Sequence, residues 1–304
     1  MGFNDIRITM ENPFTPLDSL HVPMQDYDSA TALRHDEGFK ALKEKITKER
    51  GVDTTYYKDN YLARRFLVRM RARKCDSVWQ YMQILDEDPG EWAHLLDRLT
   101  INVTEFFRNP RVWKVFQAQV LPEVFREEKK GVIVRFWSAG CSSGEEAYSI
   151  AITVNEYLKM NGLAHHIVVR GSDLDDRSLA NAKAGIYKPE ALRKATPAVR
   201  EEYFRYDPAA DRYRVSDELR TLVRFNKYDL TSMRRFRFFD VIFCRNVIIY
   251  IDRKQQMEMF SLLYDALNKG GFLILGKTES LFGKAKSMFE PVDGSERIYR
   301  KARI

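Results

Sequence analysis

The chain has 304 residues, of which 44% are hydrophobic and 31% charged, a composition typical of folded domains that excludes the disordered and membrane-embedded classes. Its length leads us to expect two domains. The formal net charge of +7 would suit nucleic acid, an anionic membrane surface or an acidic protein partner, and does not choose among them.

The apolar runs are too short to cross a bilayer, and the first residues contain no apolar signal core. We therefore expect a cytoplasmic protein without membrane insertion. Its three cysteines, Cys75, Cys141 and Cys244, form no Cys-x-x-Cys pair, which predicts reduced thiols and argues against a zinc site. The histidines also lack metal-ligand spacing, so we expect no metal.

Residues 1–30 contain three prolines and no sustained period, and are predicted to be a tail. Between residues 31 and 99, apolar side chains recur three or four positions apart, as on one face of a helix. This pattern predicts a small all-α domain. Its expected apolar positions are Phe39, Leu42, Ile46, Leu62, Phe66, Met70, Trp79, Met82, Leu85, Trp92, Leu95 and Leu99.

One helix of this domain, over residues 61–74, is strongly cationic and includes Arg64, Arg69 and Arg73. A run of charge like this is usually the solvated outer face of a helix. The alternative is a docking surface for an acidic partner.

In residues 100–304, short β-branched runs alternate with helical patterns, which predicts an open, mostly parallel α/β sheet. The expected strands are 132–137, 167–173, 222–225, 239–244, 271–276 and 298–299, and the expected helices are 147–158, 176–183 and 253–267. Residues 187–220 break the alternation with a turn-rich segment between two aromatic runs. They are predicted to form an inserted antiparallel hairpin subdomain.

A loop of small residues, 138–146, follows the first expected strand and opens the next helix. Gly140 would allow close approach of a ligand, and Glu146 would face it; the alternative is a plain structural turn. Asp173 ends the second strand, where a carboxylate can accept both hydroxyl protons of a ribose. The alternative for Asp173 is a helix N-cap, a role for which Asp175 and Asp176 are better placed.

Two further polar clusters, at 100–109 and 243–250, should face the cleft at the end of the sheet. Their candidate functional residues are Arg108, Arg245, Asn246 and Tyr250. Phe106 and Phe107 are interpreted as packing residues.

Taken together, these segments resemble the CheR family of chemotaxis receptor methyltransferases. The motifs that carry the resemblance are Thr104-x-Phe-Phe-Arg108, Trp137-Ser-Ala-x-x-Ser-x-Gly-Glu-Glu146, Ser172-Asp173, Ala184-Gly-Ile-Tyr187 and Phe243-Cys-Arg-Asn-Val-x-Ile-Tyr250. The resemblance implies an all-α domain followed by a Rossmann-like S-adenosylmethionine methyltransferase domain with an inserted β-subdomain. It also implies methyl transfer to glutamates on the cytoplasmic helices of chemoreceptors, with S-adenosylhomocysteine as the product.

The resemblance also assigns roles to individual positions. Around the methionine end of the cofactor it places Asn102, Thr104, Arg108 and Glu146; at the ribose, Asp173; at the adenine, Asp229 and Leu230; and at the reaction site, Arg245, Asn246 and Tyr250. The family often has Asn at the position of Asp229. We expect Arg108, Arg245 and Tyr250 to act in catalysis.

For partners, the resemblance favours the docking alternative for Arg64, Arg69 and Arg73, with the acidic methylation helices as ligand. The segment 207–211 is not Gly-rich, so we expect no tethering by a receptor's C-terminal pentapeptide. We also expect a monomer. Two rivals remain: a nucleic-acid methyltransferase, for which the chain lacks an Asp/Asn-Pro-Pro-Tyr/Phe motif, and a non-catalytic module that senses the cofactor.

Overall fold

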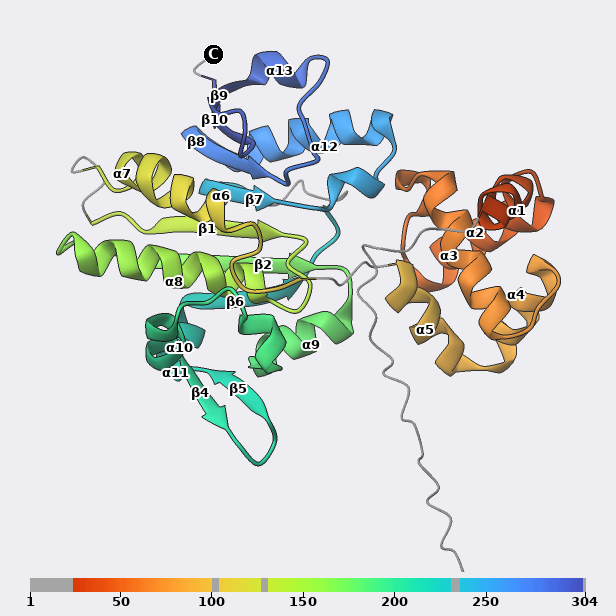
Figure 1. The fold of residues 1–304 in the computed structure, drawn as a ribbon. Helices are drawn as coiled ribbons and strands as arrows, with labels where there is room; N and C mark the ends of the chain where they lie inside the picture. Colours follow the sequence, from red (N-terminus) through yellow and green to blue (C-terminus); the bar gives the residue numbers. More distant parts are fainter. Residues whose placement is uncertain (1–23, 100–103, 127–130, 231–235, 303–304) are drawn as a thin grey trace, which may run out of the picture.

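A computed structural model describes residues 24–99, 104–126, 131–230 and 236–302, with side chains from residue 29 onward. These residues form an all-α unit and a larger α/β unit (Figure 1). Asn102 and residues 1–23 of the predicted tail lie outside the described residues. Within the described ranges, no helix has the length and apolar character that a membrane span requires.

The all-α unit buries one face of each helix around a shared core. Its elements are α1 (Met24–Arg34), α2 (Glu37–Arg50), η2 (Thr54–Tyr56), α3 (Asp59–Ala72), α4 (Val78–Glu87) and α5 (Pro89–Leu99). Helix α1 occupies positions that the sequence assigned to the tail, because Ala30 and Leu33 pack into this core. The assignment of Trp79 to the apolar face was wrong: it is 53% exposed, since the buried face of α4 runs through Val78, Met82 and Leu85.

The α/β unit is built on a seven-stranded sheet with the order β6-β2-β1-β7-β8-β10-β9. Its strands are β1 (Val134–Ala139), β2 (Ile167–Asp173), β6 (Val223–Lys227), β7 (Phe239–Cys244), β8 (Leu267–Leu275), β9 (Phe289–Asp293) and β10 (Ile298–Lys301). Strands β6, β2, β1, β7 and β8 are parallel, whereas β10 is antiparallel to both β8 and β9. The predicted open, mostly parallel sheet is confirmed.

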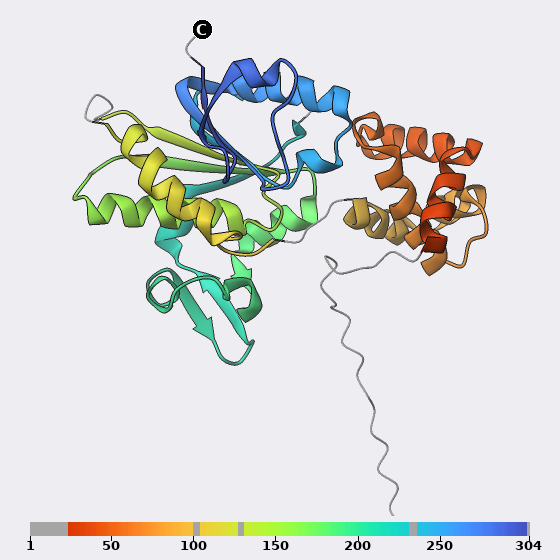
Figure 2. The same ribbon diagram turned by 45° about the horizontal axis from the view of Figure 1, so that its top comes forward.

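Helices cover both faces of this sheet (Figure 2). They are α6 (Pro110–Val115), the π-helix η3 (Phe116–Val120), α7 (Leu121–Val124), α8 (Glu145–Met160), α9 (Asp176–Ala184), α12 (Arg253–Ala266) and α13 (Ala285–Met288). Strand β7 is buried along its whole length: Val241 and Phe243 belong to the core on one face, Ile242 and Cys244 to the core on the other. This alternation on a central strand explains its uninterrupted apolar sequence.

The inserted subdomain projects from the sheet as predicted (Figure 1). It contains β3 (Ile186–Tyr187), η5 (Pro189–Leu192), α10 (Pro197–Tyr203), β4 (Phe204–Asp207), β5 (Arg212–Val215) and α11 (Asp217–Leu222). The three strands form an antiparallel sheet with the order β3-β5-β4. Phe106 is fully buried with edge-on contacts to Tyr187 and Phe204, which confirms its packing role and attaches the subdomain to the body.

The first strand was predicted two residues too early. Val132 and Ile133 are 54% and 40% exposed, and the strand begins at Val134, where pairing with Ile167 starts. The β-branched run therefore extends beyond the edge of the paired sheet.

The two units meet where the segment 56–58 lies beside the segment 249–252. The backbone contacts that join them are the bridge between Tyr57 and Ile251, Lys58 N to Tyr250 O (3.1 Å) and Asp252 N to Tyr56 O (2.7 Å). This junction follows the C-terminal end of β7, next to the carboxyl ends of the other parallel strands.

Candidate active site

A pocket opens at the carboxyl ends of the parallel strands, against the all-α unit. It encloses about 1160 Å³ of space not filled by atoms, its open mouth included. Ten residues singled out from the sequence line it: Thr104, Arg108, Gly140, Glu146, Asp173, Asp229, Leu230, Arg245, Asn246 and Tyr250. Residues separated by up to 146 positions therefore converge on one pocket.

The floor of the pocket is the loop between β1 and α8. Gly140 has φ +79°, and a Cβ there would overlap the Val247 side chain, so a larger residue would strain the loop and displace Val247. Gly144 has φ +95° and precedes the first residue of α8. Helix α8 therefore begins beside the pocket, which Glu146 of its first turn lines, as a helix does after a nucleotide-binding loop.

Asp173 stands at the end of β2, as the sequence predicted. Its Oδ2 accepts a hydrogen bond from Ser142 N at 2.7 Å, and its Oδ1 accepts one from Asp175 N at 3.1 Å. Burial raises the pKa of Asp173, while these backbone N–H groups oppose that shift. Asp175, and not Asp173, is the N-cap of α9, accepting from the N–H groups of the first turn.

Glu146 and Arg245 form an ion pair in the pocket wall. Arg245 Nη1 lies 3.1 Å from Glu146 Oε2, and Ser138 Oγ donates to Glu146 Oε1 at 2.8 Å. The other guanidinium nitrogen, Nη2, donates to Arg108 O (3.1 Å) and Asn109 Oδ1 (3.0 Å). With only 2% of its side chain exposed, Arg245 holds Glu146 and the 108–109 segment in place.

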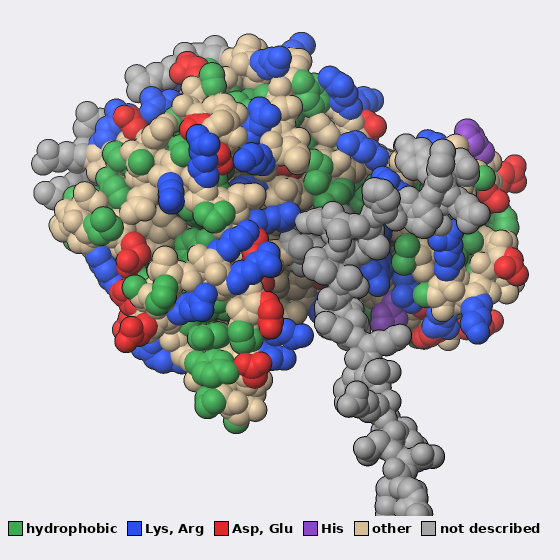
Figure 3. Space-filling view, viewed as in Figure 1, with side chains coloured by type: hydrophobic (Ala, Val, Ile, Leu, Met, Phe, Trp, Pro, Cys, Tyr) green, Lys and Arg blue, Asp and Glu red, His purple; other side chains and the backbone are tan. Residues whose placement is uncertain are grey.

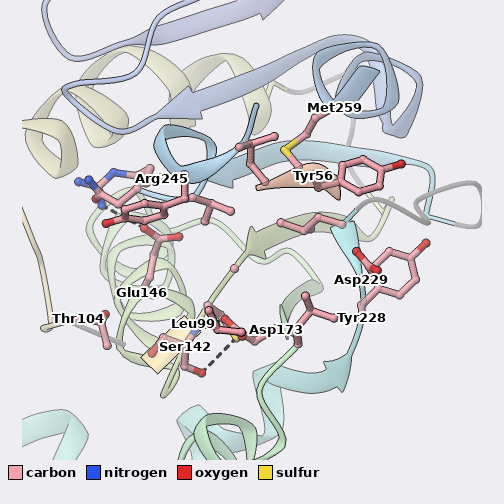
Figure 4. Close-up of a pocket in the computed structure, with 18 of the residues that line it drawn as sticks. Tyr56, Leu99, Thr104, Ser142, Glu146, Asp173, Tyr228, Asp229, Arg245 and Met259 are labelled. Carbon is pink, nitrogen blue, oxygen red and sulfur yellow. Dashed lines mark hydrogen bonds and ion pairs between the residues drawn. The ribbon is translucent and has the colours of Figure 1, made fainter. Parts of the chain in front are cut away.

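Figure 4 shows how the polar groups are distributed along the pocket. Arg245 and Glu146 lie at one end, Tyr228 and Asp229 at the other, and Asp173 between them. The order is a carboxylate able to bind an amino group, a carboxylate able to bind a diol, and then an aromatic and polar end.

The loop after β7, residues 245–250, is the predicted reacting edge of the pocket. Asn246 has φ +61°, an uncommon conformation that turns the chain sharply at the strand exit. Tyr250 lies at the other end of this loop, and its ring packs against Tyr61 of α3 with centroids 4.9 Å apart. Arg108 lines the same pocket from the segment before α6.

Several pocket residues were not predicted. Four come from the all-α unit before α3, namely Val52, Asp53, Tyr56 and Tyr57, and two others are Tyr228 and Met259. Burial raises the pKa of Tyr57. The pair Tyr56-Tyr57 could have indicated a functional role. It lies between two helical patterns, and neither aromatic residue fits the apolar period of a helix there.

Two of the predicted docking arginines, Arg64 and Arg69, lie on α3, and Arg73 is its C-cap residue; all three are outside the pocket. Arg64 is exposed. Arg69 is bound to Glu91, whose side chain is fully buried, through two hydrogen bonds of 2.8 and 2.6 Å. Arg73 lies 2.8 Å from Asp88. Figure 3 shows further Lys and Arg side chains on the visible face of both units.

The donor set fits S-adenosylmethionine. The absence of a side chain at Gly140 lets a ligand approach the backbone. A carboxylate has about four acceptor positions, so Asp173, which accepts two hydrogen bonds from the backbone, can also accept from the ribose diol. Glu146 can accept from an ammonium group. A mostly parallel sheet with this pocket at its carboxyl ends defines a Rossmann-like S-adenosylmethionine-dependent methyltransferase.

Comparison with known proteins gives the family. Residues 102–298 match the CheR methyltransferase SAM binding domain, and residues 37–100 match the CheR methyltransferase all-alpha domain. The chain is 33% identical to a chemotaxis protein methyltransferase of Klebsiella aerogenes over 81% of this chain and 83% of that protein. It is 31% identical to one of Listeria innocua over 79% and 88%. The chain therefore belongs to the CheR methyltransferase family.

Proposed function

We propose that this protein is a cytoplasmic enzyme that forms methyl esters on glutamates of chemoreceptor cytoplasmic helices. The observation that carries the proposal is the presence of Arg108 and Tyr250 in the same pocket as Glu146 and Asp173. The pocket thus offers a carboxylate acceptor both a cation and a hydroxyl beside the cofactor groups. The match to chemotaxis methyltransferases supports this choice of substrate.

The chemistry requires positioning more than proton transfer. An acceptor glutamate, with a reference pKa near ~4.3, is ionised at neutral pH and needs no general base. When bound, S-adenosylmethionine supplies an electrophilic methyl group on a sulfonium. Asp173 and Glu146 would hold the cofactor by its ribose and amino groups. Arg108 and Tyr250 would orient the acceptor carboxylate, and orientation can contribute as much as about 7–11 kcal/mol to a barrier.

Receptor docking is proposed for the arginines of α3 and its C-cap, Arg64, Arg69 and Arg73. Arg64 is exposed and can attract an acidic helix. Arg73, nine positions further along and therefore about 180° away around the helix, is partly exposed and pairs with Asp88. Arg69 contributes differently, because its guanidinium already neutralises the buried Glu91. The docking prediction thus depends mainly on Arg64.

For the inserted subdomain we propose no pentapeptide tethering. Within its β4–β5 turn, Asp207 Oδ1 accepts from Ala209 N at 3.0 Å and Ala210 N at 3.3 Å. Tyr206 donates its hydroxyl to Asp211 at 2.8 Å. The turn is closed by its own side chains, and two carboxylates there would repel a peptide's terminal carboxylate.

The deciding experiment is transfer of radiolabelled methyl groups from S-adenosylmethionine to a purified chemoreceptor cytoplasmic fragment, with RNA and DNA as competing substrates. Label on the receptor that is lost in mild alkali would identify a glutamate ester. Stable label on nucleic acid would contradict the substrate assignment. Cofactor binding without transfer to any acceptor would favour a sensing module.

Docking is tested by reversing charge on α3. The variant Arg64→Glu should lower kcat/KM for receptor and weaken its dependence on salt, because an attractive exposed contact becomes repulsive. The matched control is Lys269→Glu, an exposed residue near the start of β8, at the far end of the sheet from the pocket. Equal rates for both variants would contradict docking on α3.

A further inference from the structure

Glu279 is a buried carboxylate that lies behind the reacting edge of the pocket. It is 3% exposed and does not itself line the pocket. Its partners are backbone N–H groups. Oε2 accepts from Gly276 N (2.6 Å) and Asn246 N (3.0 Å), and Oε1 accepts from Val247 N (3.0 Å), Ile248 N (2.8 Å) and Ile249 N (3.4 Å).

These hydrogen bonds give acceptors to backbone N–H groups that lie between a strand and a helix. Strand β7 ends at Cys244, and the short helix η7 (Ile248–Tyr250) follows almost at once. The first N–H groups of a helix have no partner within it and attract a negative charge. The Glu279 carboxylate occupies that position. Burial raises its pKa, and the several backbone hydrogen bonds oppose that shift by stabilising the charged form.

The segment that Glu279 holds is the one that carries pocket side chains. Asn246, with φ +61°, Val247 and Tyr250 all line the pocket. Val247 lies directly against Gly140 of the cofactor loop. A shift of this segment would therefore move the cofactor side and the acceptor side of the site together.

We infer that Glu279 is a positioning residue: its carboxylate sets the 246–250 loop, and thereby places Asn246 and Tyr250 for cofactor binding and methyl transfer. The inference rests on the proposed roles of those two residues. It depends on the charge and on both oxygens. A glutamine at this position would turn an NH₂ group toward backbone N–H donors. The N–H groups that now bond to one of the two Glu279 oxygens would then have no acceptor.

The test compares Glu279→Gln with Asp240→Asn. Asp240 is also buried, accepts from Arg135 N at 3.0 Å, and lies on the same strand β7 at the end remote from the pocket. Three quantities are measured for each variant: the melting temperature, the Kd for S-adenosylhomocysteine by calorimetry, and kcat for methyl transfer below both melting temperatures.

We expect both variants to lose stability. In Glu279→Gln alone, Kd should rise about tenfold, and kcat should fall about 100-fold because the loop is misplaced. If Glu279→Gln changes Kd and kcat no more than Asp240→Asn does, Glu279 is only structural and the inference is overturned.

The test also gives an answer if Glu279→Gln does not fold or if the wild-type protein does not methylate receptor. If Glu279→Gln does not fold, Glu279→Asp replaces it. Its carboxylate is set back by one methylene from the N–H groups of Gly276 and of residues 246–249, so Kd and kcat should again change, and unchanged values would overturn the inference. If the wild-type protein methylates no receptor, the proposed function fails, while the Kd measurement still tests whether Glu279 positions Asn246.

Discussion

The rings of Tyr61 and Tyr250 pack at a centroid distance of 4.9 Å, so a residue of the all-α unit supports a side chain of the reacting edge. Tyr61 is itself fixed, because its hydroxyl donates to Leu99 O at 2.6 Å. The orientation of Tyr250 therefore depends on contacts from both units, and so does the role proposed for its hydroxyl.

The variant Tyr250→Phe keeps the ring packing and removes the hydroxyl. We expect kcat to fall by about 100-fold, the usual cost of losing one oriented hydrogen-bond donor in a transition state, with little change in stability or cofactor Kd. Methyl-transfer kinetics and calorimetry measure these. The control is Tyr206→Phe in the β4–β5 hairpin, which should keep wild-type kcat. Full turnover by Tyr250→Phe would exclude a role for its hydroxyl.

The variant Asp173→Asn should weaken cofactor binding by about 10- to 100-fold, since hydrogen bonds to a charged acceptor are worth about 1.5–3 kcal/mol. Calorimetric titration with S-adenosylhomocysteine measures this. The control Asp175→Asn changes the neighbouring N-cap of α9 and should leave Kd unchanged. Equal Kd values for wild type and Asp173→Asn would contradict ribose binding.

Glu145 predicts a pH dependence of stability. Burial raises its pKa from 4.5 to about 7, opposed by hydrogen bonds from Ser143. Between these values the folded state binds a proton that the unfolded state has lost, so this contribution to stability decreases as pH rises from about 4.5 to 7, by as much as about 3 kcal/mol.

Urea unfolding at a series of pH values tests the Glu145 prediction. The variant Glu145→Gln cannot titrate at this position, so its stability should not show the part of the decrease with pH that is due to Glu145. The variant Glu44→Gln, at an exposed position, should show the same decrease as wild type. If wild type and Glu145→Gln gave parallel curves, Glu145 would not titrate in this range.

Arg69 should contribute more to folding stability than a surface arginine of a cationic helix usually does. Removing it by Arg69→Ala leaves the carboxylate of Glu91 buried with only Tyr81 (2.6 Å) and the more distant Arg73 (3.4 Å) as partners. Breaking a buried ion pair typically costs about 3–5 kcal/mol. Denaturant unfolding checks this, with Arg64→Ala, expected within about 0.5 kcal/mol of wild type, as control. Similar midpoints for the two variants would refute it.

Much of the sheet could be predicted from sequence, because its strands are apolar runs. Their ends were less certain: β1 begins at Val134 and not at 132, and β8 begins at Leu267 and not at 271. The 110–124 region was missed, since Pro110 and Pro122 argue locally against a continuous helix. Pro110 in fact starts α6, where a missing N–H costs nothing, and a π-helical turn precedes Pro122. Strand β9 was missed as well, and its pairing with β10 depends on a partner that local sequence does not identify.

The candidate site was predictable where motifs follow strands, as at Asp173 and Asn246. It was not predictable where the all-α unit supplies the wall, as at Asp53 and Tyr56, because the contact between units is not encoded by any local pattern. Arg69 illustrates the same limit: its sequence neighbours suggest a solvated charge, and only the packing of α5 against α3 brings Glu91 to it.

Because Val52, Asp53, Tyr56 and Tyr57 belong to the unit that also bears the arginine helix, the two units are not interchangeable modules. A chimera in which the first hundred residues came from a relative with different receptors would also exchange one wall of the cofactor pocket. Engineering a new receptor preference by domain exchange would thus retune cofactor affinity, unless the graft keeps the pocket-lining residues of this unit, namely Val52, Asp53, Tyr56, Tyr57 and Leu99.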